Sequence, residues 1–128
     1  MTTTRFGFGD FQYEVVPDWG ISSKLGIVSD VATDSSDHVY LAVRNTPHPE
    51  NVGGSILVLD RDGNIMDSWG QDLFSTPHGI WISKEDEIFL ADSSDHTVRS
   101  YTTGGQLQFT VGTQGKTGSP GAPFNRPT

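Results

Sequence analysis

The sequence predicts an all-β fold, a partial β-propeller made of two four-stranded antiparallel blades and an N-terminal strand. Three observations lead to this prediction: a long sequence repeat, a series of short β-rich segments, and a high content of turn residues. The 128 residues include 15 glycines and 7 prolines, which favours short strands joined by turns over long helices. No window has the apolar periodicity of an amphipathic helix.

The repeat extends over most of the chain and aligns in two ungapped halves. Residues 30–43 align with 79–92 at an offset of 49, and residues 56–70 align with 98–112 at an offset of 42. The seven extra residues of the first copy lie within 44–54, where proline and glycine indicate a loop. A unit of this length that repeats along a chain is typical of propeller blades.

The end of the chain carries the beginning of a third copy. Residues 74–77 align with 124–127 at an offset of 50, which places Thr128 at the position of His78. We therefore divide the sequence into an N-terminal segment, a first blade, a second blade, and a linker with the start of a third blade. These four parts are residues 1–27, 28–75, 76–118 and 119–128.

Each copy contains four short segments rich in β-branched and aromatic residues, as β-strands are. The predicted strands of the first copy are residues 30–33, 38–43, 55–60 and 64–69. The predicted strands of the second copy are residues 79–83, 87–91, 97–101 and 106–111. The pairs Asp62-Gly63 and Gly104-Gly105 predict tight hairpins, because such turns need positive φ angles.

One more strand is predicted ahead of the blades. Residues 12–16 alternate between polar and apolar side chains, which is the pattern of a half-buried strand. In a propeller such a strand can close the ring by pairing with the last blade. It can equally pair within its own part of the chain, and the sequence leaves both alternatives open.

Charge and composition disfavour several classes of partner and site. The net charge is −8, with 16 acidic and 8 basic residues, which disfavours binding to nucleic acid and to anionic membranes. The chain has no cysteine, so disulfides, thiolate nucleophiles and cysteine zinc sites are excluded. No signal peptide or membrane-spanning stretch is visible, and we expect a cytoplasmic protein.

The second copy carries a motif of a known repeat family. It reads Pro77-His78-Gly79 followed by three apolar residues, then Ile-Phe-Leu-Ala-Asp at 88–92 and His-Thr-Val at 96–98. This pattern resembles an NHL repeat, and the first copy resembles a divergent one. The resemblance extends from about residue 13 to the end of the chain and implies a propeller of NHL type.

Other segments are similar to peptidyl-amidoglycolate lyases, and to the bacterial members in particular. They are Tyr-Glu-Val-Val-Pro-Asp-Trp at 13–19, Arg44, Phe-Ser-Thr-Pro-His-Gly-Ile at 74–80, and residues 121–128. The resemblance implies a six-bladed propeller, of which this chain holds about the first two blades. It also implies cleavage of the C–N bond of a peptidyl-α-hydroxyglycine, with zinc and calcium in the central site.

The resemblance assigns roles to four residues of this chain. His78 matches a zinc histidine, and Val31 and Ile80 match positions whose backbone carbonyls bind calcium. Arg44 matches an active-site arginine that binds the substrate carboxylate or stabilises the leaving alkoxide. The other two zinc histidines, the catalytic tyrosine and a second arginine belong to blades that this chain does not contain, so we expect no independent catalysis.

Several of these residues also have a purely structural interpretation. His78 can mark only the entry to a blade, and Arg44 can be a loop arginine that pairs with surface acids. His48 stands between two prolines of the inserted loop, where we expect it to be exposed. Trp19, Trp69 and Trp81 are expected to pack between blades.

Two acidic motifs are interpreted as turns. The sequence Asp-Ser-Ser-Asp-His occurs at 34–38 and at 92–96, but the two copies fall in different turns of the blade, which argues against a repeated metal site. Residues 60–64 (Asp-Arg-Asp-Gly-Asn) resemble the start of a calcium loop. The glutamate expected near the end of such a loop is missing, and a hairpin turn is favoured.

A chain of two blades leaves apolar blade faces without neighbours, and repeat proteins generally need about three units. We therefore expect it to bind either the missing propeller blades or other copies of itself. Three chains assembled head to tail would give six blades, with three copies of His78 around a central metal. A non-catalytic NHL scaffold that binds a peptide or protein on its open face is the other function class left open.

Overall fold

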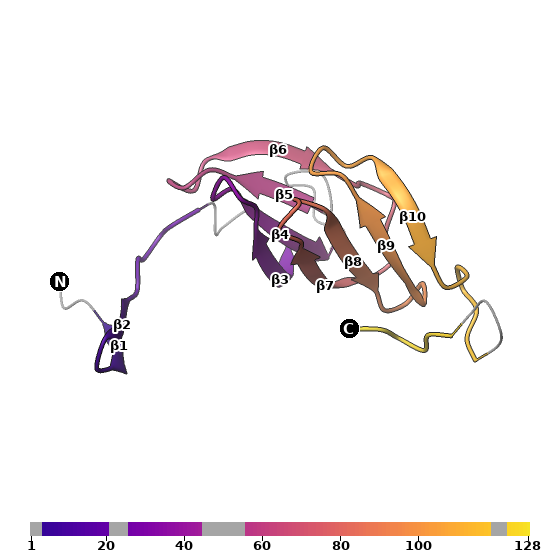
Figure 1. The fold of residues 1–128 in the computed structure, drawn as a ribbon, viewed down its shortest axis with the longest axis horizontal. Helices are drawn as coiled ribbons and strands as arrows, with labels where there is room; N and C mark the ends of the chain where they lie inside the picture. Colours follow the sequence, from indigo (N-terminus) through magenta and orange to yellow (C-terminus); the bar gives the residue numbers. More distant parts are fainter. Residues whose placement is uncertain (1–3, 21–25, 45–55, 119–122) are drawn as a thin grey trace.

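The computed structural model describes residues 4–20, 26–44, 56–118 and 123–128, which form ten strands in three antiparallel sheets (Figure 1). The strands are β1 (Arg5–Phe8), β2 (Phe11–Glu14), β3 (Ile27–Thr33), β4 (Val39–Arg44), β5 (Ile56–Leu59), β6 (Ile65–Trp69), β7 (Pro77–Ile82), β8 (Ile88–Asp92), β9 (Thr97–Tyr101) and β10 (Leu107–Val111). The predicted all-β fold is confirmed. Over these four ranges no helix is long and apolar enough to cross a membrane.

The two larger sheets are the predicted blades. Strands β3 to β6 form blade 1 and strands β7 to β10 form blade 2, and in each sheet the strands lie in the order of the sequence. All eight predicted blade strands are observed, with ends that differ by at most three residues. The largest difference is in β3, which begins at Ile27 because a bulge between Val28 and Asp30 lets its pairing with β4 continue.

Glycine turns close the outer hairpins as predicted. Gly63 and Gly105 have φ angles of 86° and 87°, a region that glycine enters without steric cost. The carboxylate of Asp60 accepts hydrogen bonds from the backbone N–H groups of Asp62 and Asn64 and from the Asn64 side chain. These contacts are those of a hairpin turn, so the turn interpretation of residues 60–64 is confirmed.

Each blade has two faces, because side chains alternate along a strand. We call the side that carries Ala32, Tyr40 and Ala42 in blade 1, and the equivalent Trp81, Phe89 and Ala91 in blade 2, the forward face. The opposite side, which carries Val31 and Leu41 in blade 1 and the equivalent Ile80 and Leu90 in blade 2, is the rear face. The same face therefore has the same register in both blades.

The core lies where the forward face of blade 1 packs on the rear face of blade 2. Its buried members are Tyr40, Ala42, Ile56, Val58, Phe74, Ile80, Ile88, Leu90 and Tyr101. Tyr101 also contacts the Trp69 ring, at a centroid distance of 5.3 Å. Burial of each large apolar side chain contributes about 1.5–3 kcal/mol, so this contact is the main source of stability between the blades.

Only one of the three tryptophans packs between the two blades. Trp69 lies against the core, as predicted. Trp81 lies on the forward face of blade 2 and is 60% exposed. Trp19 lies on the turn between β5 and β6, where its Nε1 donates to the carbonyl of Arg61 at 2.9 Å. The prediction of inter-blade packing is thus wrong for Trp19. For Trp81, whose face of blade 2 is uncovered, it stays a prediction.

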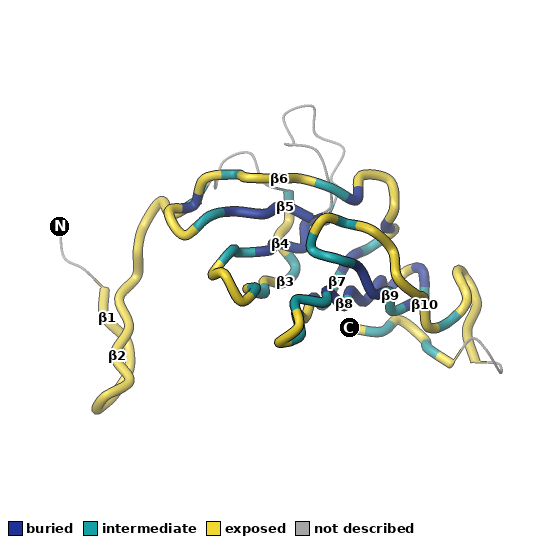
Figure 2. Tube along the Cα trace, turned by 45° about the horizontal axis from the view of Figure 1, so that its top comes forward, coloured by how far each residue is buried: buried dark blue, intermediate teal, exposed yellow. Residues whose placement is uncertain are grey.

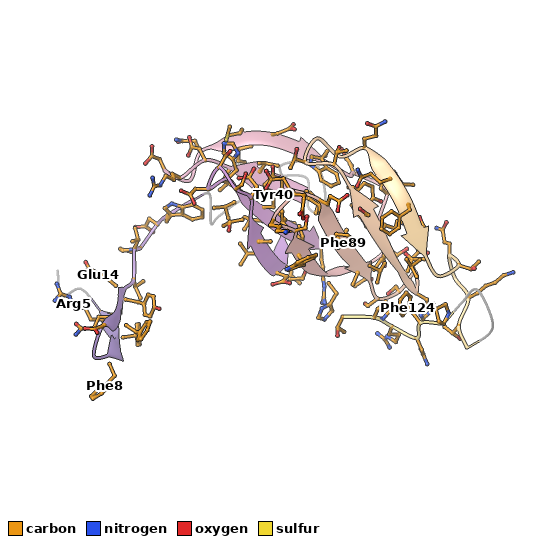
Figure 3. The ribbon with its side chains drawn as sticks, in the orientation of Figure 1. Arg5, Phe8, Glu14, Tyr40, Phe89 and Phe124 are labelled. Atoms are coloured by element: carbon orange, nitrogen blue, oxygen red, sulfur yellow. The ribbon has the colours of Figure 1, made fainter. Side chains whose placement is uncertain are left out.

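The N-terminal strand is half of a hairpin. The predicted strand at 12–16 is observed as β2, which pairs with β1 in register Phe6 to Tyr13. Arg5 and Glu14 form an ion pair across the two strands at 3.5 Å. The hairpin is exposed throughout and extends away from the blades (Figures 1 and 3). Of the two alternatives, pairing within its own part of the chain is the one observed.

The two outer faces of the blade pair differ in exposure. Among the strands, β5 of blade 1 is buried throughout and β10 of blade 2 is exposed throughout (Figure 2). On the rear face of blade 1, Leu41, Val43, Leu57 and Leu59 form a second buried cluster. The segment before blade 1 contributes to this burial, since Gly20 lies against the Leu59 side chain. On the forward face of blade 2, Trp81 and Phe109 are 60% and 47% exposed.

Candidate axial site at the blade junction

The predicted site residues gather where the first strands of the two blades meet. Strands β3 and β7 lie side by side, as the innermost strands of neighbouring propeller blades do. Val31 is in β3, His78 and Ile80 are in β7, and Arg44 is the last residue of β4. The structure therefore brings all four to one junction, although the sequence separates the outermost by 49 residues.

His78 lies in a β-bulge. In the pairing of β7 with β8, Pro77 is opposite Asp92 and Ile80 is opposite Leu90. His78 and Gly79 together therefore face the single residue Ala91, which is the two-against-one pattern of a bulge. Bulges bend a strand and redirect its side chains, and they occur frequently beside functional sites.

One end of this bulge is bound by blade 1 through the carbonyl of Pro77. The Ser29 hydroxyl lies 2.9 Å from this carbonyl oxygen and 3.2 Å from that of Ala42. The Nε of Arg44 donates to the same Pro77 oxygen at 3.5 Å. Arg44 is thus bound to the residue that precedes His78, so the two predicted residues belong to the same part of the junction.

The other end of the bulge is bound through the carboxylate of Asp30. One carboxylate oxygen accepts the backbone N–H of Ile80 at 2.9 Å, and the other accepts the N–H of Val31 at 2.9 Å. The two positions that the resemblance assigns to calcium therefore share one anionic partner.

Sequence reasoning missed Ser29 and Asp30. The available signal was the repeat alignment, which pairs Asp30 with Gly79 of the second copy.

The described residues do not complete a metal site. They contain no group of three or more histidine, cysteine, aspartate or glutamate side chains able to hold an ion together. Protein zinc sites use at least three such ligands, so His78 cannot by itself hold a zinc ion. Likewise Val31 and Ile80 cannot by themselves supply the six to eight oxygens of calcium. His48 lies outside the described residues.

The two Asp-Ser-Ser-Asp-His motifs lie in different turns, between β3 and β4 and between β8 and β9. In the first, the Asp34 carboxylate accepts hydrogen bonds from the N–H groups of Ser36 and His38, from the His38 ring and from the Tyr40 hydroxyl. Burial raises the pKa of Asp34, but these hydrogen bonds outweigh it and leave the pKa below its usual value.

The carboxylates of the second motif likewise already have hydrogen-bond and ion-pair partners. The Asp92 carboxylate accepts hydrogen bonds from the backbone N–H groups of Ser75, Thr76 and Asp95. The Asp95 carboxylate pairs with Arg99. Because these carboxylates already serve the local backbone and side chains, the interpretation of both motifs as polar turns is supported by the structure.

Comparisons with known proteins agree with this architecture. The chain is 33% identical over 97 residues to NHL repeat-containing protein 3 of Mus musculus, over 70% of this chain and 26% of the relative. It is a relative of the NHL-repeat proteins. No protein-family model matches the chain.

Two relatives from Drosophila melanogaster carry an enzyme name. Identity to peptidyl-alpha-hydroxyglycine alpha-amidating lyase 2 is 32% over 68 residues, covering 52% of this chain and 16% of the relative. Identity to lyase 1 of the same name is 28% over 126 residues, covering 82% of this chain and 23% of the relative. The chain spans about a quarter or less of the length of these relatives, which fits a partial NHL-type propeller.

Proposed function

We propose that this chain is a two-blade unit of an NHL-type propeller that has no catalysis of its own. Further blades complete its axial site, to which it contributes His78 and Arg44. The activity of the complete site would be that of a metal-dependent carbon–nitrogen lyase acting on peptidyl-α-hydroxyglycines. Zinc would be held by His78 with histidines of other blades, and calcium by the carbonyls of Val31 and Ile80 with further oxygens.

The observation that carries this proposal is the convergence at Pro77. Arg44, the last residue of β4, contacts the carbonyl directly before His78 of β7, so a guanidinium and a histidine belong to the same junction. A guanidinium suits recognition of a carboxylate, and an imidazole suits ligation of zinc. Two relatives carry the name of an alpha-amidating lyase, which supports this use of the pair.

The open forward face of blade 2 supports the need for further blades. Trp81, Phe89 and Phe109 form a continuous aromatic row on it, with ring centroids 5.4 and 6.0 Å apart. The equivalent face of blade 1 is covered by the rear face of blade 2. A hollow of about 320 Å³ lies between this row and Thr128, at the position where the next blade would begin.

The test combines light scattering with size exclusion and elemental analysis of the eluted peak, for the unaltered chain and for His78→Ala. We expect association at a stoichiometry that supplies the missing blades and binds zinc, with the zinc lost in His78→Ala. Lyase activity on a peptidyl-α-hydroxyglycine should follow zinc content. A metal-free monomer at every concentration would overturn a metal-dependent assembly of this chain, and a metal-free complex with a peptide would favour the scaffold alternative.

Association of three copies into a six-bladed ring is one arrangement of this kind. It repeats the contact of forward face on rear face that already joins blade 1 to blade 2. It also requires the rear face of blade 1 to become accessible, and that face is buried within the chain. Residues 1–20 include Trp19, which contacts Arg61, and Gly20, which lies against Leu59. Their removal should therefore increase the fraction of trimer relative to the full chain.

A further inference from the structure

We propose that Asp30 and Ser29 are positioning residues that fix the His78–Gly79 bulge and thereby set where the His78 imidazole lies. This inference rests on the proposed function, in which His78 is a ligand of the axial site. It concerns two residues for which neither the repeat motif nor the resemblance provides a role.

The bulge is held at both ends by blade 1. Ser29 donates to the Pro77 carbonyl, which precedes His78, and Asp30 accepts the N–H of Ile80, which follows Gly79. The regular ladder with β8 is interrupted between these same two residues. The conformation of His78 and Gly79 is therefore determined by the neighbouring blade as much as by their own sheet.

Asp30 is suited to this task by its charge and by its geometry. Its second carboxylate oxygen accepts the N–H of Val31 at 2.9 Å, which orients the carboxylate group along β3. A hydrogen bond to an ionised acceptor is about twice as strong as a neutral one. Asp30 is also partly buried, so water competes less for its oxygens.

Of the two junctions, the hydrogen bonds of Ser29 and Asp30 occur at the one that carries His78. At the next repeat position the residue equivalent to Asp30 is Gly79, and the residue equivalent to His78 is Thr128. Gly79 has no side chain to bind the following strand, and a Cβ placed on it would lie 3.1 Å from the carbonyl carbon of Thr128. A residue required merely for blade stacking would be expected at both positions, whereas the carboxylate is present at one.

The experiment compares Asp30→Asn and Ser29→Ala in the full chain with Asp60→Asn as a matched control. Asp60 also accepts several N–H groups through its carboxylate, but it lies in a hairpin turn away from the junction. Amide hydrogen exchange at Gly79 and Ile80 is measured by NMR together with exchange at Leu90 and Ser100 of the blade 2 sheet. In a parallel titration, Zn²⁺ is added and the His78 ring signals are followed.

We expect Asp30→Asn to increase exchange at Ile80, whose N–H Asp30 accepts, by roughly 10- to 100-fold, the range for loss of a hydrogen bond to a charged group. Exchange at Leu90 and Ser100 should match that of the control, and the Zn²⁺ response of His78 should weaken several-fold. Ser29→Ala should act in the same direction and less strongly, because Arg44 still contacts Pro77.

Two results would overturn the positioning role. One is unchanged exchange at Ile80 in Asp30→Asn, and the other is an equal increase at Leu90 and Ser100, which would mean a general loss of stability. A His78 ring that does not respond to Zn²⁺ in the unaltered chain would instead count against the proposed function. The exchange data would still decide the role of Asp30 in that case.

Discussion

This chain has two junctions, one between blade 1 and blade 2 and one between blade 2 and the C-terminal segment. The two share their packing contacts but differ in their charged residues. At the first, Phe74 packs on Gly70, and at the second, Phe124 packs on the equivalent Gly112. Residues 123–128 form no strand, yet Thr128 lies beside Gly79. The path of the chain from one blade to the next is therefore repeated.

The residues able to carry chemistry are not repeated. The first junction has Asp30, Arg44 and His78, and the equivalent residues of the second are Gly79, Ser93 and Thr128. Packing residues thus recur with the blade, whereas the aspartate, the arginine and the histidine occur once. In this repeat, the candidate site therefore lies at the positions where the two copies carry different residues.

The largest expected effect comes from breaking the core of the first junction. Ile56 is fully buried between the blades, so Ile56→Ala should destabilise the protein by about 2–5 kcal/mol through lost burial and a cavity. Urea unfolding measures this loss, and Ile56→Val, with about 0.5–1.5 kcal/mol, is available if the alanine variant does not fold. Both blades should unfold in one transition.

The control for this prediction is Ile27→Ala, because Ile27 is 57% exposed in β3. A surface change of this kind should stay within about 0.5 kcal/mol. Equal losses in the two variants, or separate transitions for the two blades, would contradict the view that the contact between forward and rear faces joins them into one unit.

A smaller effect tests whether the two junctions share one framework. Gly70 and Gly112 have φ angles of 81° and 93°. A Cβ on Gly70 would lie 2.6 Å from the Phe74 ring, and one on Gly112 would lie 2.7 Å from the carbonyl oxygen of His96. Alanine at either position should cost about 1–3 kcal/mol in the free energy of unfolding, and more at Gly112, where backbone must move.

Gly115→Ala separates backbone strain from crowding in that experiment. Gly115 also has a positive φ, 70°, but nothing lies within 4 Å of a Cβ built on it. Its alanine variant should therefore show only the conformational cost, of order 1 kcal/mol. If Gly112→Ala cost no more than this control, the second junction would not be packed as the first one is.

These comparisons also explain what the sequence could predict. The repeat located all eight blade strands, because strand periodicity and turn glycines are local properties. The resemblance to the lyases, not the repeat, is the source of the prediction that Arg44 and His78 belong to one site. It did not predict the roles of Ser29 and Asp30, because hydrogen bonds across a blade junction depend on tertiary position. Packing of Trp81 between blades stays a prediction, because its face of blade 2 is exposed.

The smallest expected effect concerns an equivalent turn in the two blades. Asp34 in the turn after β3 corresponds to Ser83 in the turn after β7, and both side chains accept two backbone N–H groups of their own turn. Asp34→Ser therefore keeps an acceptor while it removes the charge. At neutral pH we expect a loss of about 1 kcal/mol in stability, the typical net value of one or two hydrogen bonds.

The pH dependence of that loss is the sharper observation. The pKa of Asp34 is lowered in the folded protein from its ordinary value of 3.8, so the carboxylate stabilises the fold above that value. This contribution disappears as the pH falls through the lowered folded pKa. The difference in unfolding free energy between Asp34→Ser and the unaltered chain should therefore shrink as urea titrations are carried from neutral to strongly acidic pH.

Ser83→Asp, the reverse change in blade 2, should introduce a pH dependence of stability of the same sign. A pH-independent difference would mean that Asp34 acts through turn geometry alone and that its charge does not stabilise the fold.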